Sequence, residues 1–173
     1  MEDSDAGNAD RISSNIRRLD NATDFSEVYE VVKDTVRQSL GKYRVGMMLY
    51  LDNLPLQVGA YHTVGTNTII MNRALLTLVE SATTSRQTVN AFVYSILLHE
   101  YLHALGYLPE EVVRPMVYDV SVRSFGEEHV ATRLAKMGPW SVLKGIPLDR
   151  FEAPRHVIEL VKNFERTNQS YIS

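Results

Sequence analysis

The 173-residue sequence contains no cysteine. Without thiols the chain cannot form disulfides, iron–sulfur clusters or thiolate zinc sites, and it cannot use a cysteine nucleophile. Any metal ion that it binds must therefore be held by histidine, carboxylate or tyrosine side chains. The chain is long enough to bury a core of its own, so it does not need such cross-links for stability.

An excess of basic residues is also missing. The chain has 18 Lys and Arg residues against 21 Asp and Glu residues, which gives a formal net charge of −3 and a pI of about 5.9. Proteins that are dedicated to nucleic-acid binding usually carry a basic face. We therefore expect no nucleic-acid partner.

The sequence has no uninterrupted apolar run as long as a membrane-spanning helix, which needs about 18 residues or more. Its most apolar window, 91–108, is interrupted by Ser95, His99, Glu100 and His103. The first ten residues contain four acids and no Lys or Arg, unlike the basic start of a secretory signal. These features predict a cytoplasmic protein that does not bind membranes.

Hydrophobic spacing predicts an α+β fold in a single domain over 24–173, preceded by a partly disordered tail over 1–23. One helix opens the domain, the strands follow it in the first half of the chain, and further helices come after them. The expected helices cover 25–40, 73–80, 84–105, 110–124, 127–137 and 154–168, and the expected strands cover 43–51, 57–64 and 67–72.

The segment that is most informative about function is His99-Glu100-Tyr101-Leu102-His103, on the expected helix 84–105. Residues four apart lie on one face of a helix, so the two imidazoles can converge on one ion. Glu100 can then reach a water on that ion without being a ligand. The surrounding helix is apolar on nearly all sides, and burying these polar groups without a partner would be costly. A divalent cation supplies that partner, so the motif predicts a metal site.

The motif and its surroundings resemble those of zincin-type zinc metallopeptidases, in particular the small, single-domain minigluzincin and SprT-like kinds. The resemblance covers about residues 42–137, in which 59–62 and 67–76 are similar to the strands and helix that precede the motif. It implies a three-stranded or slightly larger sheet over a central active-site helix, followed by several helices. It also implies one zinc ion and a peptide or protein substrate held in extended form by an edge strand.

By this resemblance, His99 and His103 are zinc ligands and Glu100 is the catalytic acid/base. Zinc would polarise the scissile carbonyl and acidify its water, while Glu100 would carry a proton from that water to the leaving amine. His62, in a strand-like segment, is a candidate for contacting substrate. Tyr107 is another, because its hydroxyl could donate a hydrogen bond to the reaction intermediate.

The identity of the third metal ligand is left open by the sequence. Metzincin peptidases place a His six residues after the second motif His, but Pro109 stands at that position. His129 is the leading candidate, since it resembles the SprT-like His that opens a helix after a glycine, and three imidazoles would leave zinc an open position. Glu128, Glu127 and Asp119 are the alternatives.

Three other hypotheses compete with an active peptidase. A non-catalytic binding module stabilised by its metal is disfavoured by the intact Glu100, because a structural site needs no base. A DNA-associated SprT-like protease is disfavoured by the acidic charge. A latent peptidase homologue would be inhibited by its own chain, with the polar end 165–173 in the cleft or, as a rival, the acidic segment 1–10.

Overall fold

The structure is a computed structural model that describes residues 2–149 and 151–165. In chain order its elements are α1 (Glu2–Asp20), α2 (Phe25–Leu40), β1 (Met48–Asp52), β2 (Ala60–His62), β3 (Thr68–Asn72), α3 (Arg73–Ala82), α4 (Arg86–Ala104), α5 (Glu110–Phe125), α6 (Val130–Met137), the 3₁₀ helix η1 (Pro139–Leu143) and β4 (Glu159–Leu160). The α+β class expected from the sequence is confirmed.

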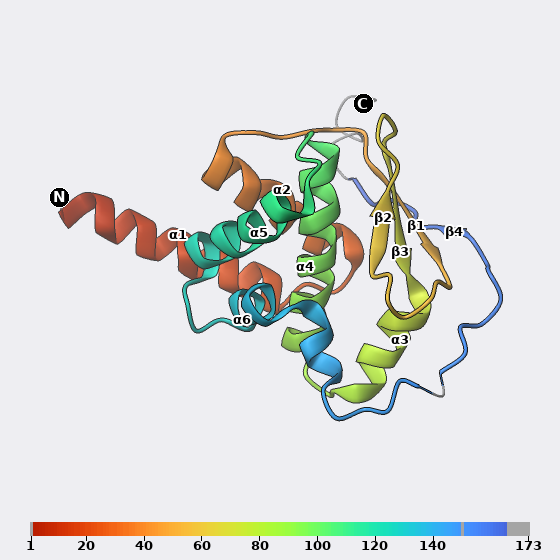
Figure 1. Cartoon of the computed structure of the whole chain (residues 1–173). Coiled ribbons are helices and arrows are strands. Elements are labelled where there is room, and N and C mark those ends of the chain that lie inside the picture. Colours follow the sequence, from red (N-terminus) through yellow and green to blue (C-terminus); the bar gives the residue numbers. More distant parts are fainter. Residues whose placement is uncertain (1, 150, 166–173) are drawn as a thin grey trace.

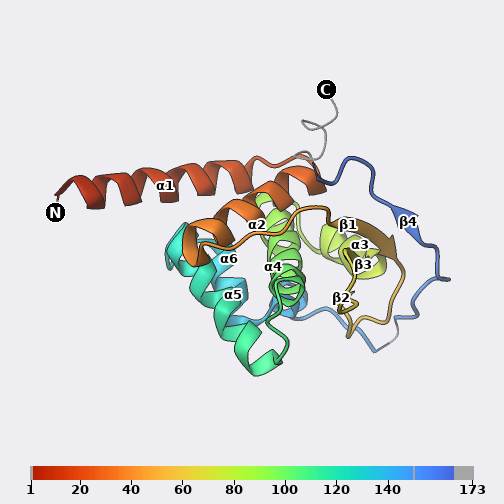
Figure 2. The same cartoon turned by 90° about the horizontal axis from the view of Figure 1, so that it is seen from above.

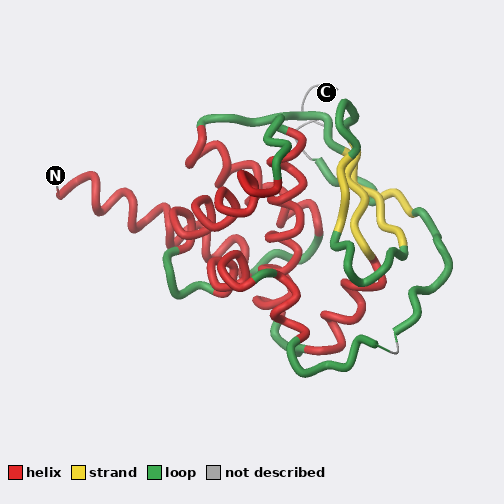
Figure 3. Tube along the Cα trace, viewed as in Figure 1, coloured by secondary structure: helices red, strands yellow, loops and turns green. Residues whose placement is uncertain are grey.

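The elements form a helical layer and a sheet, with α4 between them (Figure 1). Helices α1, α2, α5 and α6 lie on one side of α4, and the strands lie on its other side (Figure 3). Seen from above, α1 runs along the helical layer and extends past it (Figure 2). This arrangement puts the central helix, which carries the motif, against both layers.

Helix α4 is central because its sequence leaves almost no polar face. Ser85 caps its N-terminus by accepting a hydrogen bond from the Thr88 N–H, as the capping pattern predicts. Its large side chains, among them Phe92, Leu97 and Tyr101, have no exposed surface. Burial on nearly all sides stabilises this helix through packing, so the few polar groups near its C-terminal end require a specific explanation.

The sheet is mixed and has the strand order β2-β3-β1-β4. Strand β1 runs parallel to β3, while β2 is antiparallel to β3 and β4 is antiparallel to β1. Alternate residues such as Leu49, Ile69 and Met71 are buried in the core that the sheet shares with the helices. Strand β2 is therefore an edge strand, and it contacts α4 directly.

The expected helix over 154–168 is wrong for residues 154–165, and residues 166–168 lie outside the part of the chain that the structure describes. Residues 159–160 instead form β4, and the Val161 N–H donates to the Leu49 carbonyl at 2.9 Å. The buried Asp52 carboxylate also accepts from the Val157 N–H at 2.9 Å, which holds the chain in extended form along β1. These long-range hydrogen bonds outweigh the helical spacing of the apolar residues.

The region 1–23, expected as a partly disordered tail, contains α1. Its second half packs into the helical layer, where Leu19 is fully buried and the Asn15 side chain donates to the Ser124 carbonyl at 3.1 Å. Across the described residues, no helix is both long enough and apolar enough to cross a membrane.

At the other end of the described chain, Phe164 stacks on Tyr29 with ring centroids 4.2 Å apart. Glu165 is buried, and its carboxylate accepts from the Met47 N–H at 2.7 Å and pairs with Lys33 at 3.3 Å. The remainder of the segment expected to fill the cleft, 166–173, lies outside the described residues.

Candidate metal centre

The two motif histidines face each other across one turn of α4. Their Nε2 atoms are 3.2 Å apart, and the rings meet edge to face with centroids 4.9 Å apart. Helical geometry alone explains this approach, because residues four apart share a face. The structure therefore brings His99 and His103 together as the sequence predicts.

A carboxylate from the next helix completes the cluster. Glu110, in the first turn of α5, places one carboxylate oxygen 2.8 Å from His103 Nε2 and the other 3.1 Å from His99 Nε2. Across the described residues, His99, His103 and Glu110 are the group of potential ligands whose atoms all lie within 4.8 Å of one another. The geometry makes Glu110 the candidate third ligand.

A sharp turn between α4 and α5 positions the Glu110 carboxylate beside the two histidines. Gly106 has a φ of +104°, a conformation that favours glycine, and it lets the chain reverse just after α4. Helix α5 then starts with Glu110 directly after the N-capping Pro109. The same turn brings the Tyr107 carbonyl to His103 Nδ1, at 2.8 Å.

The hydrogen bond to the Tyr107 carbonyl also determines which nitrogen of the His103 ring carries a proton. Because a carbonyl only accepts, Nδ1 carries the proton, and Nε2 of the neutral ring presents a lone pair to the cluster. Burial lowers the pKa of His99, although the nearby Glu110 opposes this, and so favours the neutral ring. Burial would raise the pKa of Glu110, but the contacts with both histidines outweigh it and keep that pKa below its usual value.

Metal binding requires both imidazoles to be neutral and the carboxylate to be ionised. In that state the three groups are all acceptors, so at this range they need either protons on the imidazoles or a metal ion between them. A tetrahedral zinc ion with ligand bonds of about 2.0–2.1 Å separates its ligand atoms by roughly 3.3 Å. The separations of 2.8, 3.1 and 3.2 Å in the cluster come close to that value, so the residues fit the ion.

Glu100 lies next to the cluster and is nearly buried, with 7% of its surface exposed. Burial raises its pKa to about 7, with an opposing effect of His103 and a reinforcing effect of Glu110. It lines the same cleft as His99 and Glu110. This places a carboxyl group with a raised pKa beside His99 and His103.

The cleft has a volume of about 610 Å³ and runs between the cluster and the edge strand β2. Gly59 and Ala60 contribute its sheet side, and Trp140 of η1 contributes one wall. The Asn72 N–H donates to the Gly59 carbonyl, so the alternation of antiparallel pairing turns the main-chain groups of Ala60 and His62 away from β3. Those groups are free to pair with an extended chain.

His129, the leading candidate from the sequence, is not brought to the cluster. It caps α6, where its Nδ1 accepts from the Ala131 N–H at 3.1 Å and its Nε2–H donates to Asp20 at 2.8 Å. Its ring stacks on Phe125 with centroids 5.0 Å apart. Both nitrogens have partners within the helical layer, so Glu110 replaces His129 as the candidate third ligand.

Two of the alternative carboxylates have other partners, and the third lies outside the cluster. Glu127 accepts from the Tyr118 hydroxyl at 3.0 Å, and this hydrogen bond raises the pKa of Tyr118. Asp119 pairs with Arg123 at 3.2 Å, one turn along α5. Glu128 is exposed in the turn before α6 and does not belong to the cluster.

The two residues expected to contact substrate take different places. His62 lies on β2 and donates from Nδ1 to the Thr68 carbonyl of β3 at 3.0 Å, which ties its ring to the neighbouring strand. The Tyr107 ring packs against Lys42, whose ammonium lies 5.0 Å from the ring centroid. Tyr107 therefore acts on the candidate centre through its main-chain carbonyl.

Comparison of the chain with protein-family models, with curated proteins and with solved structures finds no match. The case for this centre therefore rests on the motif, the cluster and the cleft.

Proposed function

We propose that this protein is a metal-dependent peptidase that uses one zinc ion held by His99, His103 and Glu110. The observation that carries the proposal is the convergence of these three groups beside Glu100, in a cleft whose other side is a free strand edge. Two histidines and one glutamate form a donor set typical of catalytic zinc, which keeps an open position for substrate. The set also suits the gluzincin side of the resemblance.

A bound divalent ion supplies the Lewis acidity that polarises a carbonyl and lowers the pKa of a water. The protein supplies the rest of the chemistry. Glu100 takes a proton from a water in the cleft on its carboxylate and returns it to the leaving amine, and a pKa of about 7 suits both transfers. The Tyr107 carbonyl holds the His103 ring in one tautomer and one orientation.

The strand edge provides the binding mode for a peptide. Ala60 and His62 offer main-chain donors and acceptors on the side of β2 that faces away from β3. An extended peptide can add to this edge as a further strand, which gives affinity without reading every side chain. The same pairing lays the peptide along the cleft past Glu100.

A metal-stabilised binding module is the competing function. It accounts for the cluster but gives no role to the buried Glu100, whose carboxyl group is costly to bury unless it does chemistry or contacts a ligand. The net charge of −3 gives no support to a DNA-associated protease.

Metal content and peptide hydrolysis test the proposal together. We expect the purified chain to contain about one zinc per molecule by elemental analysis, and to cleave unstructured peptides or casein in a reaction that a chelator abolishes and zinc restores. The Glu110→Gln variant should lose zinc, whereas Glu111→Gln, its exposed neighbour on α5, is the matched control and should keep it. Zinc binding without hydrolysis of any peptide would favour the binding module, and failure to bind zinc would refute both.

A further inference from the structure

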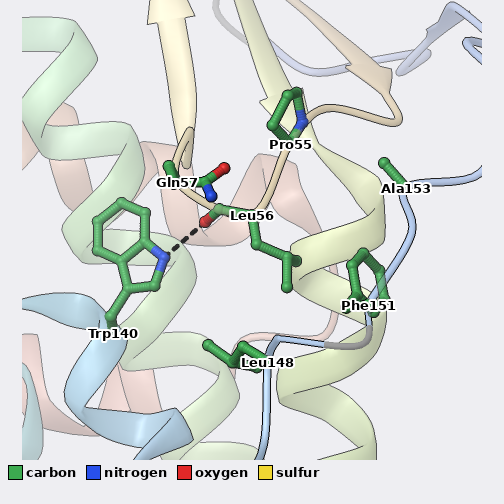
Figure 4. A pocket seen from close by; sticks show the side chains of 7 residues that line it. All are labelled: Pro55, Leu56, Gln57, Trp140, Leu148, Phe151 and Ala153. Carbon is green, nitrogen blue, oxygen red and sulfur yellow. Dashed lines mark hydrogen bonds between the residues drawn. The ribbon is translucent and has the colours of Figure 1, made fainter.

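A second hollow of about 550 Å³ adjoins the metal cleft (Figure 4). Leu56, Leu148 and Phe151 give it apolar walls, and the ring of Trp140 closes one side. Gln57 adds a polar amide. We refer to this hollow as the apolar pocket.

The apolar pocket is held open by hydrogen bonds. The buried Asn72 side chain donates to the carbonyls of Leu54, Pro55 and Val58 at 2.8–3.0 Å, which fixes the whole loop before β2. From the opposite side, the Trp140 indole N–H donates to the Leu56 carbonyl at 2.7 Å (Figure 4). These bonds fix the loop 54–58 and the indole, so this part of the pocket is formed before any ligand binds.

The side chains that line the apolar pocket favour an apolar ligand group. The indole N–H, the polar atom of Trp140, already has a partner, so the ring needs no polar group from a ligand. Apart from Gln57, the other large wall residues are aliphatic or aromatic, and they gain most from contact with another apolar side chain.

The apolar pocket lies next to the metal cleft, because Gln57 and Trp140 line both. Gly59, at the start of β2, lies so close to α4 and η1 that a Cβ atom there would meet Ile96 at 2.7 Å and Trp140 at 3.3 Å. The strand edge and the indole are thus in near contact. A peptide that pairs with β2 would therefore come close to Trp140, which also lines the apolar pocket.

We propose that the apolar pocket is a specificity subsite that receives a large apolar side chain, such as Phe or Leu, from a peptide paired with β2. This inference rests on the proposed function, since it names the substrate that the cleft prefers. A hydrophobic pocket discriminates by roughly 10- to 200-fold even for one methylene group. We therefore expect kcat/KM to fall at least about tenfold when the apolar residue at one fixed position of a peptide becomes Ala.

Binding can be measured without catalysis. Trp140 is the single tryptophan of the chain, so intrinsic fluorescence reports on this pocket. We expect N-acetyl-phenylalaninamide to change the emission of Trp140 saturably, in the zinc-loaded Glu100→Gln chain as in the unchanged one. N-acetyl-alaninamide at the same concentrations should not. The Ala153→Phe variant fills the pocket from an exposed position and should abolish the response, while Ala153→Ser is the matched control and should keep it.

The outcomes separate the two proposals. Hydrolysis without preference for an apolar residue, or probe binding that Ala153→Phe leaves unchanged, would overturn the subsite and leave the peptidase standing. Saturable binding that Ala153→Phe abolishes, in a zinc-loaded chain that cleaves no peptide, would support the pocket as a site for apolar peptide side chains and refute the peptidase. Unchanged zinc content in both variants of Ala153 shows that the cleft itself is intact.

Discussion

Replacing His129 by Ala should lower the stability of the fold and leave zinc binding unchanged. Three contacts are lost: the cap at α6, the hydrogen bond to Asp20 and the stacking on Phe125. The cap contributes about 1 kcal/mol, the hydrogen bond about 1 kcal/mol and the ring contact about 0.5–1 kcal/mol. The free energy of unfolding should therefore fall by about 3 kcal/mol, which lowers Tm by about 6–12 °C in a chain of this length.

Replacing Glu110 by Ala should instead lower zinc affinity and leave the stability of the metal-free fold nearly unchanged. Its side chain is 53% exposed, so its loss should scarcely change the stability of the metal-free chain. Zinc affinity should fall by more than about 100-fold, because even partners that only orient a ligand are worth about 10- to 100-fold. Glu111→Ala is the control for charge on the first turn of α5.

Two measurements separate these effects: urea unfolding with a chelator present, and competition for zinc against a chromophoric chelator. The reasoning fails if His129→Ala loses zinc while the metal-free chain unfolds as before. It fails equally if Glu110→Ala keeps its zinc affinity.

Three further predictions address other sites. Glu100→Gln should keep zinc and lower kcat by about 10²- to 10⁴-fold, checked by elemental analysis and peptide kinetics; nearly full activity would remove Glu100 from the mechanism. Asn72→Ala should lower the free energy of unfolding by about 2–4 kcal/mol in urea titrations, because the loop 54–58 loses its buried partner; an unchanged midpoint would contradict this. Burial opposes ionisation of Asp52, but hydrogen bonds from His156 and two main-chain N–H groups outweigh it and lower its pKa. Its contribution is full above the ordinary value of 3.8 and fades as pH falls through the lower folded pKa, so Asp52→Asn should flatten the acid limb of the stability profile.

The motif helix could be predicted because its determinants are local. The Ser85 cap, the apolar spacing and the glycine after the helix all lie within one stretch of sequence, and they act over one or two turns. His99, Glu100 and His103 share that helix, so their relative positions follow from its periodicity.

Glu110 was missed because its position depends on a turn. The sequence has Pro109 where metzincin peptidases have their third ligand, and the next residue reaches the candidate centre only because α5 starts there and folds back along the cleft. The direction of α5 after Gly106 is set by packing in the helical layer, which spacing alone does not reveal. His129 was misplaced for the same reason, since its partner Asp20 is 109 residues away in the sequence.

For residues 154–165 the local pattern predicts a helix, but long-range hydrogen bonds determine an extended structure instead. The apolar residues of this segment have helical spacing, but Val157 and Ile158 are exposed. The main-chain N–H groups of this segment instead donate to the Asp52 carboxylate and the Leu49 carbonyl of β1. Edge pairing of this kind depends on residues about 100 positions away. Propensity within the segment carries no information about it.

The residues of the candidate centre are close together in the sequence, and this affects the order in which parts of the protein can fold. His99 and Glu110 are only eleven residues apart, so closing the loop between them costs little conformational entropy, whereas Val157 must meet Asp52 across 105 residues. A zinc ion present during folding can therefore join α4 to α5 before β4 pairs with β1. Zinc would then act as a folding nucleus, and refolding should be faster with the ion than without it.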